Sequence, residues 1–253
     1  MAVPLHMGWR HVLFANWPVS PALVAAHLPD SLDVDTFDGE AWLSVVPFTN
    51  VDVRPTWWPA GWGLPLPELN LRTYVTHDGI DGVYFFSLDA QGIVGVVGAR
   101  LFHHLPYYYA RIDLQVVEAG TKEEVPAIEA EAGAREEVPA DGAAVRFESQ
   151  RLHPGARPVH YRASYGPTGE RFRAEPDSLD EFLTERYRYY TESQDGVLRY
   201  ASIDHEPWPL YQATVEESEN TLFAANGFVR PESEPVLRYS PGVDTRASSS
   251  RRA

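Results

Sequence analysis

Short segments of β-strand character recur along the chain, and turn residues separate them at close intervals. ELNLRTYVTH and GVYFFSLDA alternate around a DGIDG turn, which predicts a hairpin over residues 68–90. LDVDTF and AWLSVVPF flank an Asp-Gly pair and predict a hairpin over residues 32–48. AAVRFESQRL and RPVHYRASYG predict a third strand pair over residues 143–166. Many short strands with few helices exclude a βαβ alternation and predict a mainly β barrel closed over one core.

Helical signals are few. Ser20 and Pro21, ahead of ALVAAHL, predict an N-cap and a short helix. GIVGVVGARLFHHL, residues 92–105, is interpreted as a second short helix, after which YYYARIDLQVVE returns to strand. Ser178 and Glu181 have capping-box spacing ahead of LDEFLTERYRYYTES, whose apolar residues fall at helical intervals. We interpret this last segment as a helix packed on the barrel mouth; lining the pocket is the alternative.

Three segments lack a regular pattern. Residues 49–67 hold four prolines and three tryptophans, which favours a long loop that is either a lid or a cover packing its tryptophans on the barrel. Residues 118–141 are acidic and predict an exposed excursion between strands. Residues 231–253 predict a poorly ordered tail, which leaves residues 1–230 as a single domain.

The charge balance excludes several classes of partner. Asp and Glu number 36 against 21 Lys and Arg, for a net charge of −15, which repels nucleic acid and anionic membrane surfaces. Cysteine is absent and no apolar run is long enough to cross a membrane, so we expect a cytoplasmic protein. Lys122 is the only lysine, a bias typical of proteins from a high-salt cytoplasm; a GC-rich genome is the alternative explanation.

No common nucleotide, hydrolase or zinc-protease motif occurs, so the motifs predict no cofactor. His103 and His104 are adjacent and would project about 100° apart on a helix, which is poor geometry for joint metal ligation. The sequence therefore predicts no metal site.

Eight segments together resemble the YqjF-like family of unknown function: FANWPVSPALVAAHLP, LDVDTFDGEAWLSVVPF, PELNLRTYV, GVYFFSLDA, ARLFHHLPYYYARI, FLTERYRYY, HEPWPL and LRYSPGVDT. The resemblance covers roughly residues 8–245, with the segments in the family's order. It implies a distant relationship to acetoacetate decarboxylase-like proteins, and with it an antiparallel, cone-shaped β-barrel that encloses a pocket.

The resemblance also implies where the chemistry differs. The glutamate of the decarboxylase pattern matches Glu68, whereas the two positions of its lysines, one of which forms the Schiff base, match Tyr107 and Tyr108. A phenol forms no imine with a ketone. Lys122 lies in TKEEV, where carboxylates favour its charged form, so we predict that the protein is not an amine-dependent decarboxylase.

A carboxylate, phenols and arginines remain at the equivalent pocket. Glu68 is a candidate general acid or base if burial raises its pKa, and Tyr107 is a candidate donor to a developing oxyanion. Candidate ligand-binding residues complete the set: Arg72 and Arg100 for a carboxylate, and Asn70, Tyr108, Trp42 and Phe86.

Each candidate has a structural alternative, because Glu68 and Arg72 can each pair with a cross-strand charge and the tyrosines are ordinary strand residues. Three hypotheses follow: an enzyme acting on a small carbonyl or carboxylate compound without a Schiff base, a non-catalytic small-molecule binder, or a homo-oligomeric protein with a filled barrel. Burial of Glu68 beside an empty volume would favour the first two.

Overall fold

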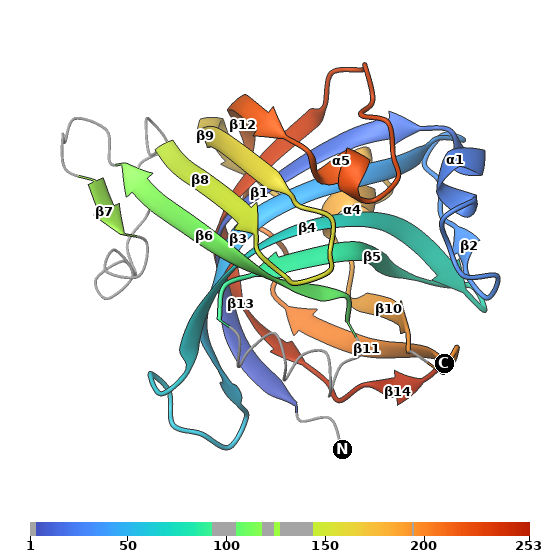
Figure 1. Ribbon diagram of the computed structural model, residues 1–253, viewed down its shortest axis with the longest axis horizontal. Helices are drawn as coiled ribbons and strands as arrows, with labels where there is room; N and C mark the ends of the chain where they lie inside the picture. Colours follow the sequence, from blue (N-terminus) through green and yellow to red (C-terminus); the bar gives the residue numbers. More distant parts are fainter. Residues whose placement is uncertain (1–3, 93–104, 118–123, 127–143, 194) are drawn as a thin grey trace.

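The computed structural model describes residues 4–92, 105–117, 124–126, 144–193 and 195–253, which form one continuous sheet with three short helices (Figure 1). The strands are β1 (Leu5–Val19), β2 (Asp33–Val34), β3 (Ala41–Pro55), β4 (Leu64–His77), β5 (Ile80–Ala90), β6 (Tyr107–Val117), β7 (Glu124–Pro126), β8 (Ala144–Arg151), β9 (His160–Phe172), β10 (Arg188–Glu192), β11 (Leu198–His205), β12 (Leu210–Asn220), β13 (Val236–Ala247) and β14 (Arg251–Arg252). The helices are α1 (Pro21–Ala25), α4 (Leu179–Thr184) and α5 (Leu222–Ala225).

The sheet closes on itself twice. One ring runs β5-β4-β3-β1-β13-β12-β9-β8-β6 and closes through a parallel pairing of β6 with β5. The other runs β11-β10-β5-β4-β3-β1-β13 and closes where β11 pairs with β13. In Figure 1, β8, β9 and β12 lie on one side of the shared strands, and β10, β11 and β14 lie on the other. The mainly β, closed architecture predicted from the sequence is confirmed, although β5 pairs in parallel with both β6 and β10.

Side chains fill the first of these rings, which we call the filled ring. Its core contains fully buried residues from strands far apart in the sequence, among them Leu43, Leu71, Phe147 and Tyr239. The second ring, which we call the cavity ring, receives the opposite faces of the shared strands. Because β1 and β3 are covered on both sides, their sequences lack the simple alternation of a half-exposed strand, whereas β4 alternates between apolar residues in the filled ring and polar residues at the cavity.

Several local predictions are confirmed. The hairpin over residues 68–90 forms from β4 and β5, and its turn places Asp78 and Gly79 at φ of 50° and 74°. This left-handed backbone suits Asp and Gly in a two-residue hairpin turn. The strand pair over residues 143–166 corresponds to β8 and β9, and Pro21 opens α1 directly after Ser20.

The prediction of a hairpin over residues 32–48 is wrong in its pairing. The Asp38-Gly39 turn exists and a single bridge joins Phe37 to Glu40, but β2 then pairs with β4 instead of β3. The physical reason is that β3 already has β1 and β4 as neighbours along its buried length, so no edge remains for β2.

The loop predicted for residues 49–67 is much shorter, because β3 continues to Pro55 and β4 starts at Leu64. A bulge at Asp52, with φ of 50°, turns its carboxylate to accept hydrogen bonds from the backbone N–H groups of Gly61 and Gly63. Side-chain bonds of this kind stabilise a tight loop in spite of its prolines.

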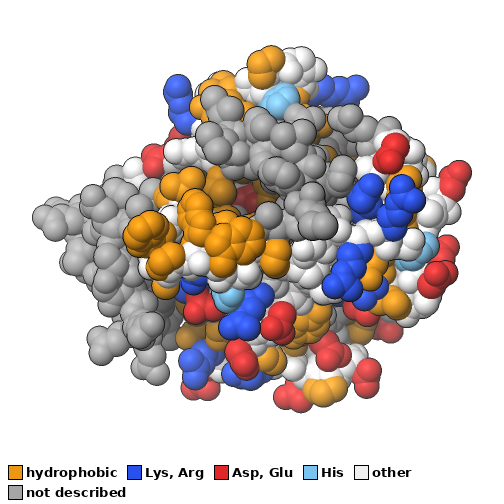
Figure 2. Space-filling model, turned by 90° about the horizontal axis from the view of Figure 1, so that it is seen from below, with side chains coloured by type: hydrophobic (Ala, Val, Ile, Leu, Met, Phe, Trp, Pro, Cys, Tyr) orange, Lys and Arg blue, Asp and Glu red, His pale blue; other side chains and the backbone are white. Residues whose placement is uncertain are grey.

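The short loop does not act as a cover. The side chains of Trp57, Trp58 and Trp62 are 63%, 46% and 70% exposed, which contradicts the interpretation that they pack on the barrel. In Figure 1 the loop projects from the lower side of the sheet, and Figure 2, which views the molecule from below, shows hydrophobic side chains gathered on this face.

The predicted long helix after Ser178 ends early. Its N-terminus is as predicted, since the Ser178 hydroxyl accepts a hydrogen bond from the Glu181 N–H, but α4 stops at Thr184. The segment from Arg188 to Glu192 is β10, which pairs with β11 and β5. Tyrosine and threonine favour strands, and the open edge of β5 overrides the helical spacing of the sequence. The predicted helix over residues 92–105 lies outside the described residues except at its ends, and so does most of the excursion over residues 118–141.

The prediction of a poorly ordered tail from residue 231 is wrong. Residues 236–247 form β13, which pairs with β1 from Asn16 to Leu5 and also contacts β11 and β12. Tyr239 of this strand is fully buried in the filled ring. The Pro and Ser residues that suggested disorder lie at the ends of the strand and at a bend beside Gly242, which has a φ of 130°.

We predict that a chain ending at residue 230 does not fold, because both rings lose β13 and are left open. Circular dichroism and urea titration should show no cooperative unfolding transition. A chain that lacks only residues 250–253, which contain the exposed two-residue strand β14, serves as the control and should unfold cooperatively. A cooperative transition of the shorter chain would contradict the assignment of β13 as an integral strand.

Candidate functional site

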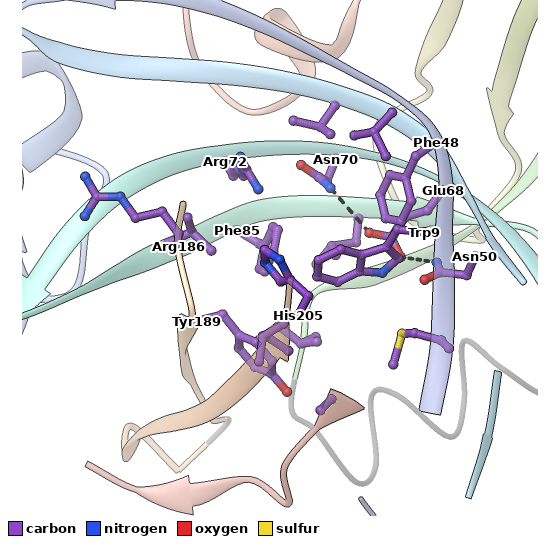
Figure 3. A pocket seen from close by; sticks show the side chains of 18 of the residues that line it. Trp9, Phe48, Asn50, Glu68, Asn70, Arg72, Phe85, Arg186, Tyr189 and His205 are labelled. Carbon is purple, nitrogen blue, oxygen red and sulfur yellow. Dashed lines mark hydrogen bonds between the residues drawn. The ribbon is translucent and has the colours of Figure 1, made fainter. Parts of the chain in front are cut away.

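The cavity ring encloses a cavity of about 140 Å³ (Figure 3). Side chains from β1, β3, β4, β5, β10 and β11 line it, and most of them are apolar or aromatic. Four of the polar exceptions gather on β4 and its neighbour β3: Asn50, Glu68, Asn70 and Arg72. Other polar residues of the lining come from other parts of the chain: Thr184, Arg186, Arg188 and His205. An apolar pocket with a few convergent polar groups is the usual form of a small-molecule site.

Glu68 is the acidic group of the cavity, and only 4% of its surface is exposed. Its carboxylate accepts hydrogen bonds from the Tyr107 hydroxyl at 2.7 Å and from the amides of Asn50 and Asn70, each at 3.4 Å (Figure 3 draws the two amide bonds). Burial raises the pKa of Glu68 to about 7, although these three hydrogen bonds act in the opposite direction. The negative charge of Asp89 adds to the increase. Near neutral pH, Glu68 therefore populates both protonation states.

Tyr107 reaches Glu68 because β6 starts beside the end of β5, where Tyr107 pairs with Leu88. Burial raises the pKa of Tyr107 well above its ordinary value, and the neighbouring Glu68 charge adds to this shift. The phenol stays protonated and acts as a hydrogen-bond donor.

A buried ion pair anchors the strand that carries Tyr107. Arg151 of β8 binds Asp89 of β5 through two hydrogen bonds, Nε to Oδ1 at 2.5 Å and Nη2 to Oδ2 at 2.8 Å. The Arg151 guanidinium also lies 4.1 Å from the centre of the Tyr108 ring. Tyr108 thus faces away from the cavity, whereas the sequence placed it at the ligand.

Arg72 and Asn70, both predicted as ligand-binding residues, line the cavity. Arg72 donates from Nη2 to the Leu183 carbonyl at 3.2 Å, and its Nε is buried without a hydrogen-bond partner. Asn70 Oδ1 is likewise buried and without a partner. No ion pair joins Arg72 to a carboxylate in the described part of the chain, whereas Arg186, also at the cavity, binds Asp35 and Asp81.

Two other predicted residues do not line the cavity. Trp42 packs in an apolar cluster with Tyr74 and Leu88, and Phe86 packs against Phe228, with 4.8 Å between ring centres. The cause for Phe86 is a β-bulge in β5, since Leu71 pairs with Ser87 whereas Arg72 pairs with Phe85. The extra residue reverses the alternation, so that Phe85 faces the cavity instead. Arg100 and Lys122 lie outside the described residues.

Sequence reasoning missed part of the cavity wall. Asn50 was assigned to an irregular loop, although it lies on β3 opposite Trp9 of β1. Trp9 stacks on Trp208, with 5.7 Å between ring centres and 5° between ring planes, and His205 contacts both rings. The spacing of the HEPWPL segment gives no sign that His205 and Trp208 flank the same cavity.

The model of the family DUF2071, described as an uncharacterized conserved protein, matches residues 6–244. The chain belongs to this family. It is 41% identical over 241 residues to the uncharacterized protein YqjF of Bacillus subtilis (strain 168), which covers 95% of this chain and 88% of the relative. As a DUF2071 member, it carries the YqjF resemblance expected from its sequence segments.

Solved structures confirm the expected fold of this DUF2071 protein. An acetoacetate decarboxylase-like enzyme from Sphingomonas wittichii RW1 superposes with a TM-score of 0.62 at 16% identity, over all of this chain and 93% of the other. The enduracididine biosynthesis enzyme MppR, complexed with pyruvate, superposes with a TM-score of 0.62 at 12% identity, over all of this chain and 91% of the other. At these identities the comparison establishes the shared fold.

The described part of the DUF2071 protein contains neither a membrane-spanning helix nor a cluster of metal ligands. None of its described helices is long and apolar enough to cross a membrane. Its described histidine and acidic side chains form no group of three that could hold a metal ion.

We predict that Glu68 makes stability fall as pH rises. Its pKa is about 7 in the folded chain against an ordinary value of 4.5, so between these values the folded state binds more protons than the unfolded state. The contribution of Glu68 is fully present below pH 4.5 and is lost as pH rises through about 7. The difference amounts to roughly 3 kcal/mol, from 1.36 kcal/mol per pKa unit.

Urea unfolding of the wild type and of Glu68→Gln, measured between pH 4.5 and 8, tests this prediction. The glutamine keeps an acceptor for Tyr107 but does not titrate, so the difference in stability between the two proteins should change with pH by this amount. A difference independent of pH would contradict the raised pKa.

Proposed function

We propose that the cavity binds a small carbonyl or carboxylate compound and that Glu68 exchanges a proton with it, without a covalent bond between protein and ligand. The observation that carries this proposal is the buried Glu68–Tyr107 pair at the cavity, with a carboxyl pKa of about 7. A general acid or base works best when its pKa is near the ambient pH. The pair is thus suited to remove a proton from a carbon next to a carbonyl group.

Tyr107 supplies the complementary group. When Glu68 takes up a proton from carbon, negative charge develops on the carbonyl oxygen of the ligand. The Tyr107 hydroxyl lies 2.7 Å from the Glu68 carboxylate, so it is within reach of a ligand that contacts this carboxylate. A hydroxyl that turns toward the oxygen stabilises the enolate in a cavity lined mainly by apolar side chains.

The surroundings of Arg72 favour a ligand that carries a carboxylate. Its guanidinium lies among aromatic rings, 5.4 Å from the centre of Phe14 and 5.8 Å from that of Tyr74, and its Nε has no partner. A half-buried cation that no described carboxylate neutralises favours an anionic ligand. Pyruvate, which is bound by the structural neighbour MppR, combines a carbonyl with a carboxylate and is therefore a suitable probe.

No lysine is present among the described residues that line the cavity. This composition supports non-covalent chemistry, in keeping with the tyrosines expected at the lysine positions. Borohydride reduction in the presence of pyruvate or acetoacetate should leave the protein mass unchanged. A stable adduct, seen by mass spectrometry, would contradict this part of the proposal.

Deuterium exchange into the methyl group of pyruvate, followed by NMR in D2O, tests the acid/base function. The wild type should accelerate exchange, and Glu68→Gln should lower the rate by about 10²-fold or more, because the proton acceptor is lost. Tyr107→Phe should cause a smaller loss, since the base remains. Glu148→Gln, which changes an exposed carboxylate on β8, is the matched control and should leave the rate unchanged.

A non-catalytic binding protein is the second candidate. It is favoured by the mutual hydrogen bonds of Glu68, Tyr107, Asn50 and Asn70, because polar groups that pair with one another need no reacting partner. Calorimetric binding of pyruvate without accelerated exchange would support this function. Absence of both binding and exchange would contradict both candidate functions for pyruvate-like ligands.

A further inference from the structure

His205 presents a hydrogen-bond acceptor at the cavity that the proposed acid/base chemistry does not use. It is the last residue of β11, and its Nδ1 lies 2.8 Å from the Glu206 carbonyl oxygen. Because a carbonyl only accepts, the ring hydrogen is assigned to Nδ1 and the lone pair to Nε2. Nε2 is buried and has no hydrogen-bond partner.

The orientation of the His205 ring is fixed by its neighbours. The ring centre lies 5.7 Å from that of Trp9, 5.0 Å from that of Trp208 and 4.8 Å from that of Tyr187. Glu185 holds this wall together, because it accepts hydrogen bonds from the Trp208 backbone N–H and from the Tyr187 hydroxyl. The imidazole cannot turn away from the cavity without disturbing this packing (Figure 3).

The charges around the ring favour its neutral form. Burial lowers the pKa of His205, and the positive charge of Arg72 acts in the same direction. The Glu206 carbonyl and the carboxylates of Glu185 and Asp204 act in the opposite direction without reversing the shift. The ring at neutral pH therefore offers an acceptor at Nε2.

Glu68 and His205 lie on different sides of the cavity ring. Along its strand order, β4 and β11 are separated by β5 and β10 in one direction and by β3, β1 and β13 in the other. A ligand whose carbonyl meets Glu68 and Tyr107 on β4 and β6 can thus extend across the cavity toward His205. An unsatisfied buried acceptor at that end discriminates strongly between ligands with and without a donor.

We propose that the cavity selects small keto acids that carry a hydroxyl or N–H group at the end remote from the reacting carbonyl, and that this group donates a hydrogen bond to His205 Nε2. The proposal rests on the proposed function, since it assigns the substrate class of the same site. His205 acts here as a specificity-determining residue.

Calorimetric titration with matched pairs of 2-oxo acids tests this proposal. The pairs are 4-hydroxy-2-oxobutanoate with 2-oxobutanoate, and 5-hydroxy-2-oxopentanoate with 2-oxopentanoate. In at least one pair the hydroxylated acid should bind the wild type about tenfold more tightly, as expected when a buried acceptor gains its donor. In His205→Phe, which keeps a planar ring without an acceptor, the ratio of the two Kd values should fall to about one or reverse.

A second variant distinguishes the loss of the acceptor from misfolding of the protein. His205→Gln retains an acceptor oxygen and should keep part of the preference, and near-ultraviolet circular dichroism checks that the tryptophan wall is intact in both variants. Equal binding within both pairs, or a preference that survives in His205→Phe, would overturn the assignment of His205 while leaving the proposed function in place. Failure of all four acids to bind the wild type would overturn both.

Discussion

The structure depends on two strands that change partner along their length. The first part of β5 pairs with β10 and its last residues pair with β6; β13 pairs first with β12 and then with β11. One sheet therefore closes into two rings that share β5, β4, β3, β1 and β13. Every shared strand must then be buried on both faces, and each face meets a different interior. Leu69 and Leu71 enter the filled ring, whereas Glu68, Asn70 and Arg72 enter the cavity ring.

This arrangement explains why a carboxylate can be kept inside the protein. An isolated buried charge is costly, so the group either pairs or takes up a proton. Glu68 does both in part, since Tyr107 and two amides solvate it and its pKa rises to about 7. The Asp89–Arg151 pair on the other face of β5 holds β6 in the position that makes the Tyr107 bond. The site is thus held in place from the face of the sheet opposite the cavity.

Local patterns in the sequence predicted the mainly β fold and the β4–β5 hairpin, because period-two alternation and turn residues are local properties. The resemblance to acetoacetate decarboxylase-like proteins, and no local pattern, made Glu68 and Tyr107 candidates at one pocket, and their mutual hydrogen bond was not predicted. Phe86 shows the limit of this reasoning, since a single bulge exchanges it for Phe85 and no residue type marks the bulge. Residues 188–192 and 236–247 also escaped prediction. Their strand pairing is decided by open edges on β5, β1 and β11. These partners are distant along the chain, so a stretch of about a dozen residues does not reveal them.

The position of β13 affects how the chain folds during its synthesis on the ribosome. Its partner β1 is synthesised earlier and has to wait for a strand made more than two hundred residues later. Until then β1 exposes an unpaired edge on a nascent chain already rich in apolar strands, a situation that invites association with other chains. The two rings are thus completed only after β13 has been synthesised, and a nascent β1 is the segment that a chaperone would have most reason to shield.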